Sequence, residues 1–592
     1  MTTAELLLNG GRITTQDEKL PEADWLALAD GRVLATGRGA PPPALVASRT
    51  KRIELDGRRV IPGLNDSHLH VIREGLNYFL ELRWDGLDSL AEGLARLRER
   101  AAHTPPPQWV RVIGGWSEWQ FAERRMPTLE ELNQAAPDTP VMVLHLYDCA
   151  LLNRAALRAL GMDANTPSPP GGLIARDAGG NPTGLLVAEP NAFLLYSTLA
   201  QAPKLAPEDQ LLSSRHFMRE LNRFGVTSVG DAGGGWQNYP EDYAVVRALA
   251  ERGEMTLRIA YSLFAQKPGV ELADYTRWIG MTKPGQGDAW LRVNGAGENL
   301  VWSGADFENF LQPRPDLRPV MEKELEGVIR ALVAARWPFR IHATYDESIQ
   351  RFLTVFERVN RDVPFSGLRW FFDHCETVSP QSLERVAALG GGIAIQHRMA
   401  FQGEYFVRRF GRAAARATPP VRAMLRAGIP VGAGTDGTRV ASYHPWTCLQ
   451  WLVTGKTVGG TELTDASERL TREEALRLYT HGSAWMSGEE DVKGRLVPGA
   501  LADLAVLSDD YLRVPEESIR SIESVLTVTG GRIVHASAPF AALAPALPPV
   551  APGWSPVAKY GGWAGERRSS ERAPQLVLMG ADGRLWGGGC GC

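Results

Sequence analysis

With 592 residues, 44% of them hydrophobic and 22% charged, the chain is too long for a single ordinary core, so we expect a globular protein of two or more structural units. Its net charge of -4, with both signs interspersed, argues against a nucleic-acid or membrane partner, and no apolar run reaches the roughly 18 residues of a membrane span. Five scattered cysteines, and a first stretch without a secretion-signal pattern, predict a protein of the reducing cytoplasm.

Short strands separated by turn dipeptides begin and end the chain. The first group comprises residues 5–9, 25–29, 32–36 and 52–55. A similar alternation returns at residues 494–499, 502–507 and 531–535. Neither group has enough apolar faces to be stable alone. We therefore predict that residues 1–60 and 494–540 pair in one composite β-sandwich domain.

Helical and strand patterns alternate between these two groups. Helices are expected at residues 90–102, 210–224, 242–252, 323–336, 348–359, 382–389 and 420–427. Short, mostly apolar strands are expected at residues 225–231, 257–262, 289–294, 339–342, 368–374, 392–396 and 429–436. Such strands imply a parallel sheet covered on both faces, and about eight βα units over residues 61–493 fit a (β/α)8 TIM-type barrel. An open doubly wound sheet is the alternative, but no Gly-x-Gly-x-x-Gly follows a first strand.

Two segments fall outside this alternation. Residues 104–200 are rich in Pro, Gly and Trp, and we interpret them as an insertion that covers the substrate. Its aromatic residues would line a pocket or, equally, pack inside the insertion; these are Trp116, Trp119, Phe121 and Tyr147. Residues 541–592 form a C-terminal tail whose last residues, Cys590 and Cys592, could bind a metal, although we favour a loosely docked end.

The stretch Val60–His70 ends an apolar run with two histidines one residue apart. Side chains of a strand alternate between its faces, so His68 and His70 point the same way and Leu69 points the other way. Two imidazoles on one side of a strand end can hold a divalent metal. The alternative is a polar strand end with two unrelated histidines.

Ionisable residues also close three later strands. His342, His374 and Asp436 each end an apolar run and precede loop-like sequence. Catalytic residues of a (β/α)8 barrel lie at the C-terminal ends of its strands. Taken singly, each could be a satisfied core histidine or a helix-capping aspartate. As a set in barrel order with His68 and His70, they predict a site for zinc with an open position for water.

Val60–His70 resembles the opening motif of the amidohydrolase superfamily, and residues 470–480 followed by 494–507 resemble its closing segment. The details are similar to the YtcJ-like branch (amidohydrolase-3), which includes N-substituted formamide deformylases. Over roughly residues 4–536 the likeness is carried by Trp116, Arg125-Met-Pro-Thr128, Leu132, Pro137-Asp138, Asn153, Gly184, His444-Pro-Trp446 and Val453-Thr-Gly-Lys456.

The resemblance implies a metal-dependent hydrolase acting on carbon–nitrogen bonds other than peptide bonds. His68, His70 and Asp436 would hold a first metal ion. His342 and His374 would hold a second ion or orient water and substrate.

The number of metal ions depends on the fourth strand. Many relatives bridge two ions there with a carboxylated lysine, whereas Arg292 lies near that position in this chain. A guanidinium stays protonated and cannot form that bridge. We therefore favour one zinc ion, the alternative being two ions bridged by the carboxylate of Glu298.

The implied reaction is hydrolysis of an amide or N-formyl bond of a small molecule by a metal-activated water. Asp436 would accept the proton of this water and pass it to the leaving nitrogen, and His374, if it is not a ligand, would donate to the developing oxyanion. Candidate substrate contacts are Trp116, Gln396 and Arg292. The alternatives are a deaminase of a cyclic amidine or heterocycle and a non-catalytic amidohydrolase-like binding protein. A homodimer is an open alternative, because relatives are often dimers.

Overall fold

The computed structural model describes residues 2–189, 192–306, 310 and 316–563. Within these residues, eight parallel strands form a barrel in the order β18-β17-β16-β15-β14-β13-β12-β6. Their bounds are β6 (Leu64–Leu69), β12 (Val226–Asp231), β13 (Arg258–Leu263), β14 (Leu291–Ala296), β15 (Phe339–Ala343), β16 (Trp370–His374), β17 (Gly392–Gln396) and β18 (Val431–Gly434). The predicted (β/α)8 barrel is confirmed.

Backbone hydrogen bonds close the ring between its first and last strands. The N–H of Asp436 donates to the carbonyl of His68 over 2.8 Å, and the N–H of His70 donates to the carbonyl of Gly437 over 3.3 Å. These bonds lie at the carboxyl ends of β6 and β18. The closure therefore brings Asp436 beside the two histidines of the first strand.

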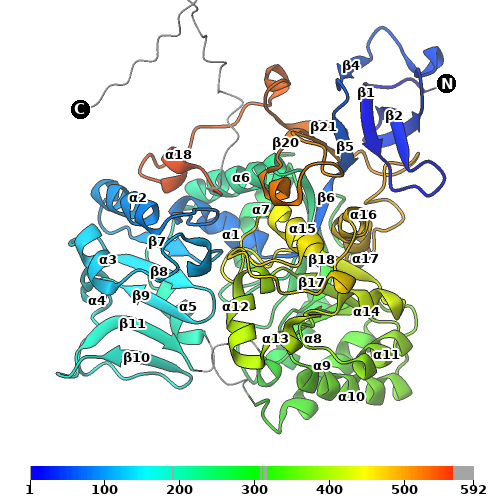
Figure 1. The fold of residues 1–592 in the computed structure, drawn as a ribbon. Coiled ribbons are helices and arrows are strands. Elements are labelled where there is room, and N and C mark those ends of the chain that lie inside the picture. The colour runs from blue at the N-terminus through cyan, green and yellow to red at the C-terminus, as the bar shows by residue number, and fades with distance from the viewer. Residues whose placement is uncertain (1, 190–191, 307–309, 311–315, 564–592) are drawn as a thin grey trace, which may run out of the picture.

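Helices cover the outside of the barrel (Figure 1). They are α1 (Val71–Asn77), α6 (Pro207–Arg223), α7 (Ala244–Glu251), α8 (Glu271–Met281), α9 (Met321–Ala334), α10 (Asp346–Asp362), α11 (Pro380–Ala388), α12 (Met399–Phe410), α13 (Arg412–Ala415), α14 (Val421–Arg426), α15 (Pro445–Thr454), α16 (Arg472–Arg477) and α17 (Ser483–Met486). The predicted helices agree with the observed bounds to within a few residues. Seven helices of this list were not predicted: α1, α8, α12, α13, α15, α16 and α17. On α10, Phe352 and Phe356 belong to a buried stripe at helical spacing, and Phe356 stacks on Phe372 of β16 at 5.8 Å between ring centroids.

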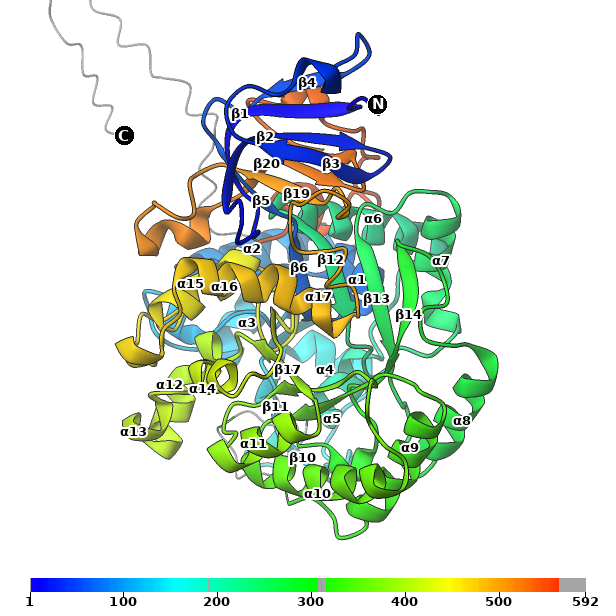
Figure 2. The same cartoon turned by 90° about the vertical axis from the view of Figure 1, so that its right-hand side faces the viewer.

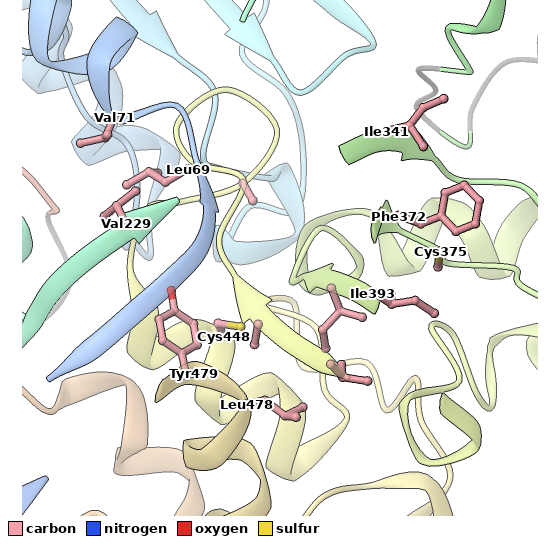
Figure 3. Packing of buried hydrophobic residues seen from close by; sticks show 14 of the residues in the cluster. Leu69, Val71, Val229, Ile341, Phe372, Cys375, Ile393, Cys448, Leu478 and Tyr479 are labelled. Carbon is pink, nitrogen blue, oxygen red and sulfur yellow. The ribbon is translucent and has the colours of Figure 1, made fainter. Parts of the chain in front are cut away.

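Apolar side chains from the barrel strands fill the space under these helices. Figure 3 shows Leu69, Val229, Ile341 and Phe372 in this core. Because strand side chains alternate, the outward position of Ile341 turns its neighbours Arg340 and His342 inward. The same alternation that builds the core thus aims polar side chains into the barrel.

Strands from both ends of the chain form one eight-stranded sheet. Its order is β21-β20-β19-β5-β1-β2-β3, with β4 paired to β1. The strands are β1 (Leu6–Thr14), β2 (Glu22–Ala29), β3 (Arg32–Gly37), β4 (Lys51–Glu54), β5 (Arg59–Pro62), β19 (Leu504–Leu507), β20 (Ser524–Thr529) and β21 (Arg532–Ala536). Figure 2 shows the N-terminal strands in front of the C-terminal ones, and Leu8, Val60, Leu504 and Leu526 share one core. The two ends of the chain stabilise each other.

The strand predicted at residues 494–499 is wrong. This segment is a turn, with φ of 79° at Gly494 and 89° at Gly499, and Pro498 lacks the N–H that a ladder needs. Leu496 is nevertheless buried in the core of the composite sheet. The apolar pattern correctly indicated burial, but the backbone makes no ladder there.

The insertion contains a sheet of its own beside the barrel (Figure 1). Its order is β10-β11-β9-β8-β7. Its elements are β7 (Val110–Ile113), α3 (Leu129–Ala135), β8 (Val141–His145), β9 (Cys149–Leu152), α4 (Arg154–Leu160), β10 (Gly172–Arg176), β11 (Pro182–Ala188) and α5 (Phe193–Leu199). The helix α2 (Leu90–His103), which precedes the predicted start of the insertion, packs against α3. Along β8, Val141 and Val143 pack into one core, and Met142 and Leu144 pack into another. Both faces of β8 are therefore buried.

The described part of the tail ends on the barrel. It contains α18 (Pro556–Tyr560), and Trp563 stacks on His444 with 4.0 Å between ring centroids. Cys590 and Cys592, weighed above as metal ligands, lie outside the described residues. Within the described ranges, no helix combines the length and the apolar character needed to cross a bilayer.

Candidate metal centre

Four imidazoles and two carboxylates meet at the carboxyl end of the barrel. All six side chains are buried. They come from the ends of five strands or the residues that follow them: His68 and His70 (β6), Glu298 (β14), His342 (β15), His374 (β16) and Asp436 (β18). The structure thus brings together every metal ligand predicted from the sequence.

His70 presents a free lone pair to a carboxylate. Its Nδ1 donates to the backbone carbonyl of Gly233, which leaves Nε2 unprotonated in the neutral ring. Nε2 lies 3.2 Å from Oδ1 of Asp436. A lone pair and a carboxylate oxygen at this distance repel each other unless a cation or a proton lies between them.

The ring of His68 contacts a carboxylate, that of Asp373, where the ring of His70 contacts a backbone carbonyl. Nδ1 of His68 lies 2.9 Å from Oδ1 of Asp373, and the buried Nε2 of His68 has no hydrogen-bond partner among the described residues. Nε2 faces Asp436 Oδ1 at 3.5 Å and Glu298 Oε2 at 3.6 Å. A carboxylate behind a histidine orients the ring of a metal ligand in this way.

His342 and His374 form a second group around Glu298. Oε2 of Glu298 lies 3.2 Å from His342 Nδ1 and 3.4 Å from His374 Nε2. The other oxygen, Oε1, lies 3.7 Å from His70 Nε2. Glu298 therefore stands between the two groups of histidines.

The electrostatics of the site favour a divalent cation. Burial alone would raise the pKa of both carboxyl groups, but His68 and the other histidines hold the pKa of Glu298 and of Asp436 well below the ordinary range. Burial, with Arg398 next in effect, keeps the pKa of His374 well below its ordinary value. The donor set is thus two carboxylates with imidazole nitrogens, which fits zinc or a similar ion.

Backbone strain at two strand ends helps to aim these ligands. His374 has φ of 79° and Asp436 has φ of 56°, a region that residues other than Gly seldom occupy and that often marks functional sites. At His374 this conformation breaks the strand alternation. Asp373 and His374 can therefore both reach the site, although they are neighbours in sequence.

Asp373 was not predicted as a site residue from the sequence, because strand alternation places its side chain on the face opposite to that of His374. It holds His68 and also accepts a hydrogen bond from Nε of Arg340 at 2.8 Å. Although burial opposes the charged ring, Asp373 raises the pKa of His68 to about 10. A metal ion at Nε2 must therefore displace a proton, and its affinity depends on this carboxylate.

We expect Asp373→Asn to lower metal affinity or turnover by about 10- to 100-fold. Asn keeps the size of the side chain and an acceptor for the His68 N–H, but it removes the negative charge. Metal titration followed by elemental analysis measures the effect, and the melting temperature reports any loss of the Arg340 ion pair. Unchanged metal affinity in a folded variant would contradict the role of Asp373.

The three predicted substrate contacts lie elsewhere. Trp116 is buried inside the insertion against Trp84, and its Nε1 donates to the carbonyl of Leu144 over 3.2 Å. Arg292 pairs with Glu489 at 2.8 Å. Gln396 donates to the carbonyl of Ala394 over 2.8 Å. None of the three is among the residues that line the cavity beside the metal centre.

A cavity of about 260 Å³ opens beside His70 and Glu298. Its walls are mainly aromatic and include Tyr147, Phe193, Tyr196, Trp236, Phe264 and Trp302. Two arginines, Arg73 and Arg439, also line it. Of the aromatic residues considered from the sequence, Tyr147 lies here, whereas Trp116 and Phe121 pack together in the insertion at 5.5 Å between ring centroids.

Comparison with known proteins agrees with this architecture. Residues 51–535 match the family model described as "Amidohydrolase family". The chain is 27% identical over 543 residues to "Putative amidohydrolase YtcJ" of Bacillus subtilis, covering 89% of this chain and 98% of the relative. It is 26% identical over 551 residues to "N-substituted formamide deformylase" of Arthrobacter pascens, covering 89% and 97%.

Among solved structures, the fold is shared with an uncharacterized metal-dependent hydrolase from Pyrococcus horikoshii. The TM-score is 0.63 at 22% identity, over 86% of this chain and 99% of that chain. At this level of identity the likeness shows a common fold. It extends over nearly the whole of the Pyrococcus protein.

Proposed function

The chain belongs to the amidohydrolase family, and from this premise we propose that it cleaves an amide or N-formyl bond of a small aromatic compound at the centre described above. It is a metal-dependent hydrolase acting on carbon–nitrogen bonds other than peptide bonds. One observation carries the choice of substrate: the aromatic cavity opens directly onto His70 and Glu298. The name of the Arthrobacter relative supports an N-formyl group as the bond cleaved.

We propose two metal ions rather than the single ion favoured from the sequence, with zinc as the metal. The support is Glu298, whose Oε2 lies 3.6 Å from His68 Nε2 on one side and 3.2 Å from His342 Nδ1 on the other. A carboxylate can share its oxygens between two ions, as Arg292 could not. One ion would be held by His68, His70 and Asp436, and the other by His342 and His374, with Glu298 between them.

A divalent metal held by these residues supplies a nucleophilic water at neutral pH and polarises the scissile carbonyl. Asp436 has one oxygen directed at His68 and His70, and its Oδ2 lies 3.9 Å from His374 Nδ1. It is placed to accept a proton from the attacking water and to return it to the leaving nitrogen. The aromatic walls of the cavity keep other water away from the reacting carbonyl.

We propose that the insertion covers the substrate. Tyr147 and Tyr196 belong to the insertion, whereas Phe264 and Trp302 follow barrel strands, and all four line the same cavity. A substrate in this cavity would be enclosed between the two units. This supports the role assigned to residues 104–200 from their composition.

A cytoplasmic location remains our proposal. The three cysteines within the described residues, Cys149, Cys375 and Cys448, are unpaired and buried. Burial raises the pKa of all three thiols, which makes them unreactive. Free thiols of this kind suit a reducing compartment.

Removal of the metal tests the proposed function. We expect a chelator to abolish formate release from N-(2-phenylethyl)formamide and zinc to restore it, with about two ions per chain at full activity. The melting temperature should rise with zinc concentration, because an ion at 100 times its dissociation constant stabilises the folded state by about 2.7 kcal/mol. Turnover that survives complete metal removal would contradict the proposal. Ammonia release from a cyclic amidine, without formate from the formamide, would favour the deaminase.

A further inference from the structure

Two arginines line the cavity beside the metal centre, and among the described residues neither guanidinium has an acid in direct contact. Arg73 lies on α1, three residues after His70, and Arg439 lies three residues after Asp436. Both line the same cavity as His70. Among the described residues, neither guanidinium makes a hydrogen bond or an ion pair; their backbone carbonyls accept from Asn77 Nδ2 and from the N–H of Gly115.

Fully buried arginines of the barrel are paired with acids, whereas Arg73 and Arg439 are half-buried. Arg83 contacts Glu74 and Glu81, Arg340 contacts Asp373, and Arg398 contacts Glu376. Pairing of this kind is expected, since a guanidinium carries five N–H donors and is costly to leave unsatisfied away from water. Arg73 and Arg439 therefore differ from these arginines in making no direct ion pair with a described residue, although the negative charges of Glu81 and Glu74 also act on Arg439.

The two guanidinium groups line the same cavity. Burial, and next the positive charge of Arg73, lowers the pKa of Arg439 to about 10, so Arg439 remains charged at neutral pH. The Arg439 guanidinium lies over the ring of Tyr196 at 4.5 Å from its centroid. A Cβ atom at Gly234 would lie 2.7 Å from Nη1 of Arg73. A larger residue at position 234 would therefore clash with this guanidinium group.

We propose that Arg73 and Arg439 together bind a carboxylate of the substrate. Two forked cations that line one aromatic cavity suit the planar, two-oxygen shape of a carboxylate. The inference rests on the proposed function of the metal centre, which would act on the other end of the same molecule. The substrate class is then an N-formyl or N-acyl aromatic amino acid or a similar aromatic amido acid.

The reaction is an ordinary hydrolysis. The C–N bond of the amide breaks, and the carbonyl carbon forms a C–O bond to the oxygen of water. A proton of the water goes to the leaving nitrogen, so the products are an aromatic amino acid and formate or another carboxylate. No oxidant, reductant or second substrate is needed.

A matched pair of substrates tests the proposal. N-formylphenylalanine, used as both enantiomers, differs from N-(2-phenylethyl)formamide only by its carboxylate. With the zinc-loaded protein, we expect kcat/KM for the better enantiomer to exceed that for the neutral compound by about tenfold or more. In Arg73→Gln and in Arg439→Gln, the ratio of the two kcat/KM values should fall by about tenfold or more.

The control variant is Arg98→Gln. Arg98 is exposed on α2, so this variant removes the same charge far from the cavity and should leave the ratio unchanged. A ratio near one in the wild type, or a ratio that neither cavity variant changes, would overturn the proposal.

Binding of unreactive compounds separates this inference from the catalytic function. By calorimetry, the zinc-loaded protein should bind 3-phenylpropanoate more tightly than 3-phenylpropan-1-ol, and both cavity variants should lose this preference. A carboxylate bound only to the metal would be insensitive to the arginines, which would overturn the inference. If the arginine-dependent preference holds but neither formyl compound is hydrolysed, the proposed reaction fails and the anion site stands.

Discussion

Replacement of Asp436 by Asn is expected to lower kcat by about 10³-fold while most of the metal stays bound. The amide keeps an oxygen that can contact the metal, but it cannot accept the proton of the attacking water. Oδ1 of Asp436 lies 3.2 Å from His70 Nε2 and 3.5 Å from His68 Nε2, so the side chain is placed among the ligands. The measurement is kcat for a formyl substrate together with metal content per chain.

Asp88→Asn is the matched control for this variant. Asp88 is exposed and lies 3.9 Å from Arg520, far from the ligand set, so turnover and metal content should match the wild type. Near-native turnover in Asp436→Asn would assign proton transfer to another group. Loss of metal together with turnover would instead show that Asp436 acts chiefly as a ligand.

Replacement of Glu298 by Gln is expected to remove about one of the two metal ions and to lower kcat by about 100-fold or more, the upper range for changes around a metal. Gln has nearly the same shape but no charge, and its amide nitrogen cannot bind a cation. Glu298 lies within 3.7 Å of ring nitrogens in both histidine groups. Without its carboxylate, the two groups would no longer share a ligand. Elemental analysis and kcat at saturating zinc measure the two effects.

Glu130→Gln serves as the control, because Glu130 is exposed and pairs with Arg154 on the surface of the insertion. It should retain the metal content of the wild type. An unchanged metal count in Glu298→Gln would contradict the bridging role. If wild type and variant both held one ion, the single-ion site favoured from the sequence would stand.

The metal centre and its cavity depend on contacts between segments that are far apart in the sequence. Closure of the barrel brings Asp436 to the histidines of β6 through the bond from its N–H to the carbonyl of His68, 2.8 Å long. The N–H of His342 donates to the carbonyl of Glu298 over 3.1 Å, which sets the second group. The insertion then adds Tyr147 and Tyr196 to the cavity. A change in the two backbone contacts would alter the arrangement of the metal ligands, and a change in the insertion would alter the shape of the cavity.

Much of the barrel and the ligand set could be predicted from the sequence because both depend on local patterns. A buried parallel strand is a short apolar run, and an ionisable residue at the end of such a run marks the catalytic end of the barrel. His68, His70, His342, His374 and Asp436 were found in this way, and the structure places them together. The strand predicted at residues 494–499 is wrong because apolar content indicates burial but does not specify hydrogen bonds to a neighbouring strand.

Only the tertiary structure decided which other side chains reach the site. Asp373 enters it because the left-handed backbone at His374, with φ of 79°, breaks the alternation that the sequence suggests. Arg73 and Arg439 are separated by hundreds of residues, and nothing local to either indicates that they share a cavity. Trp116 carries the family resemblance, yet it packs inside the insertion. Contacts between distant segments follow from how whole units pack, and a local pattern contains no information about that packing.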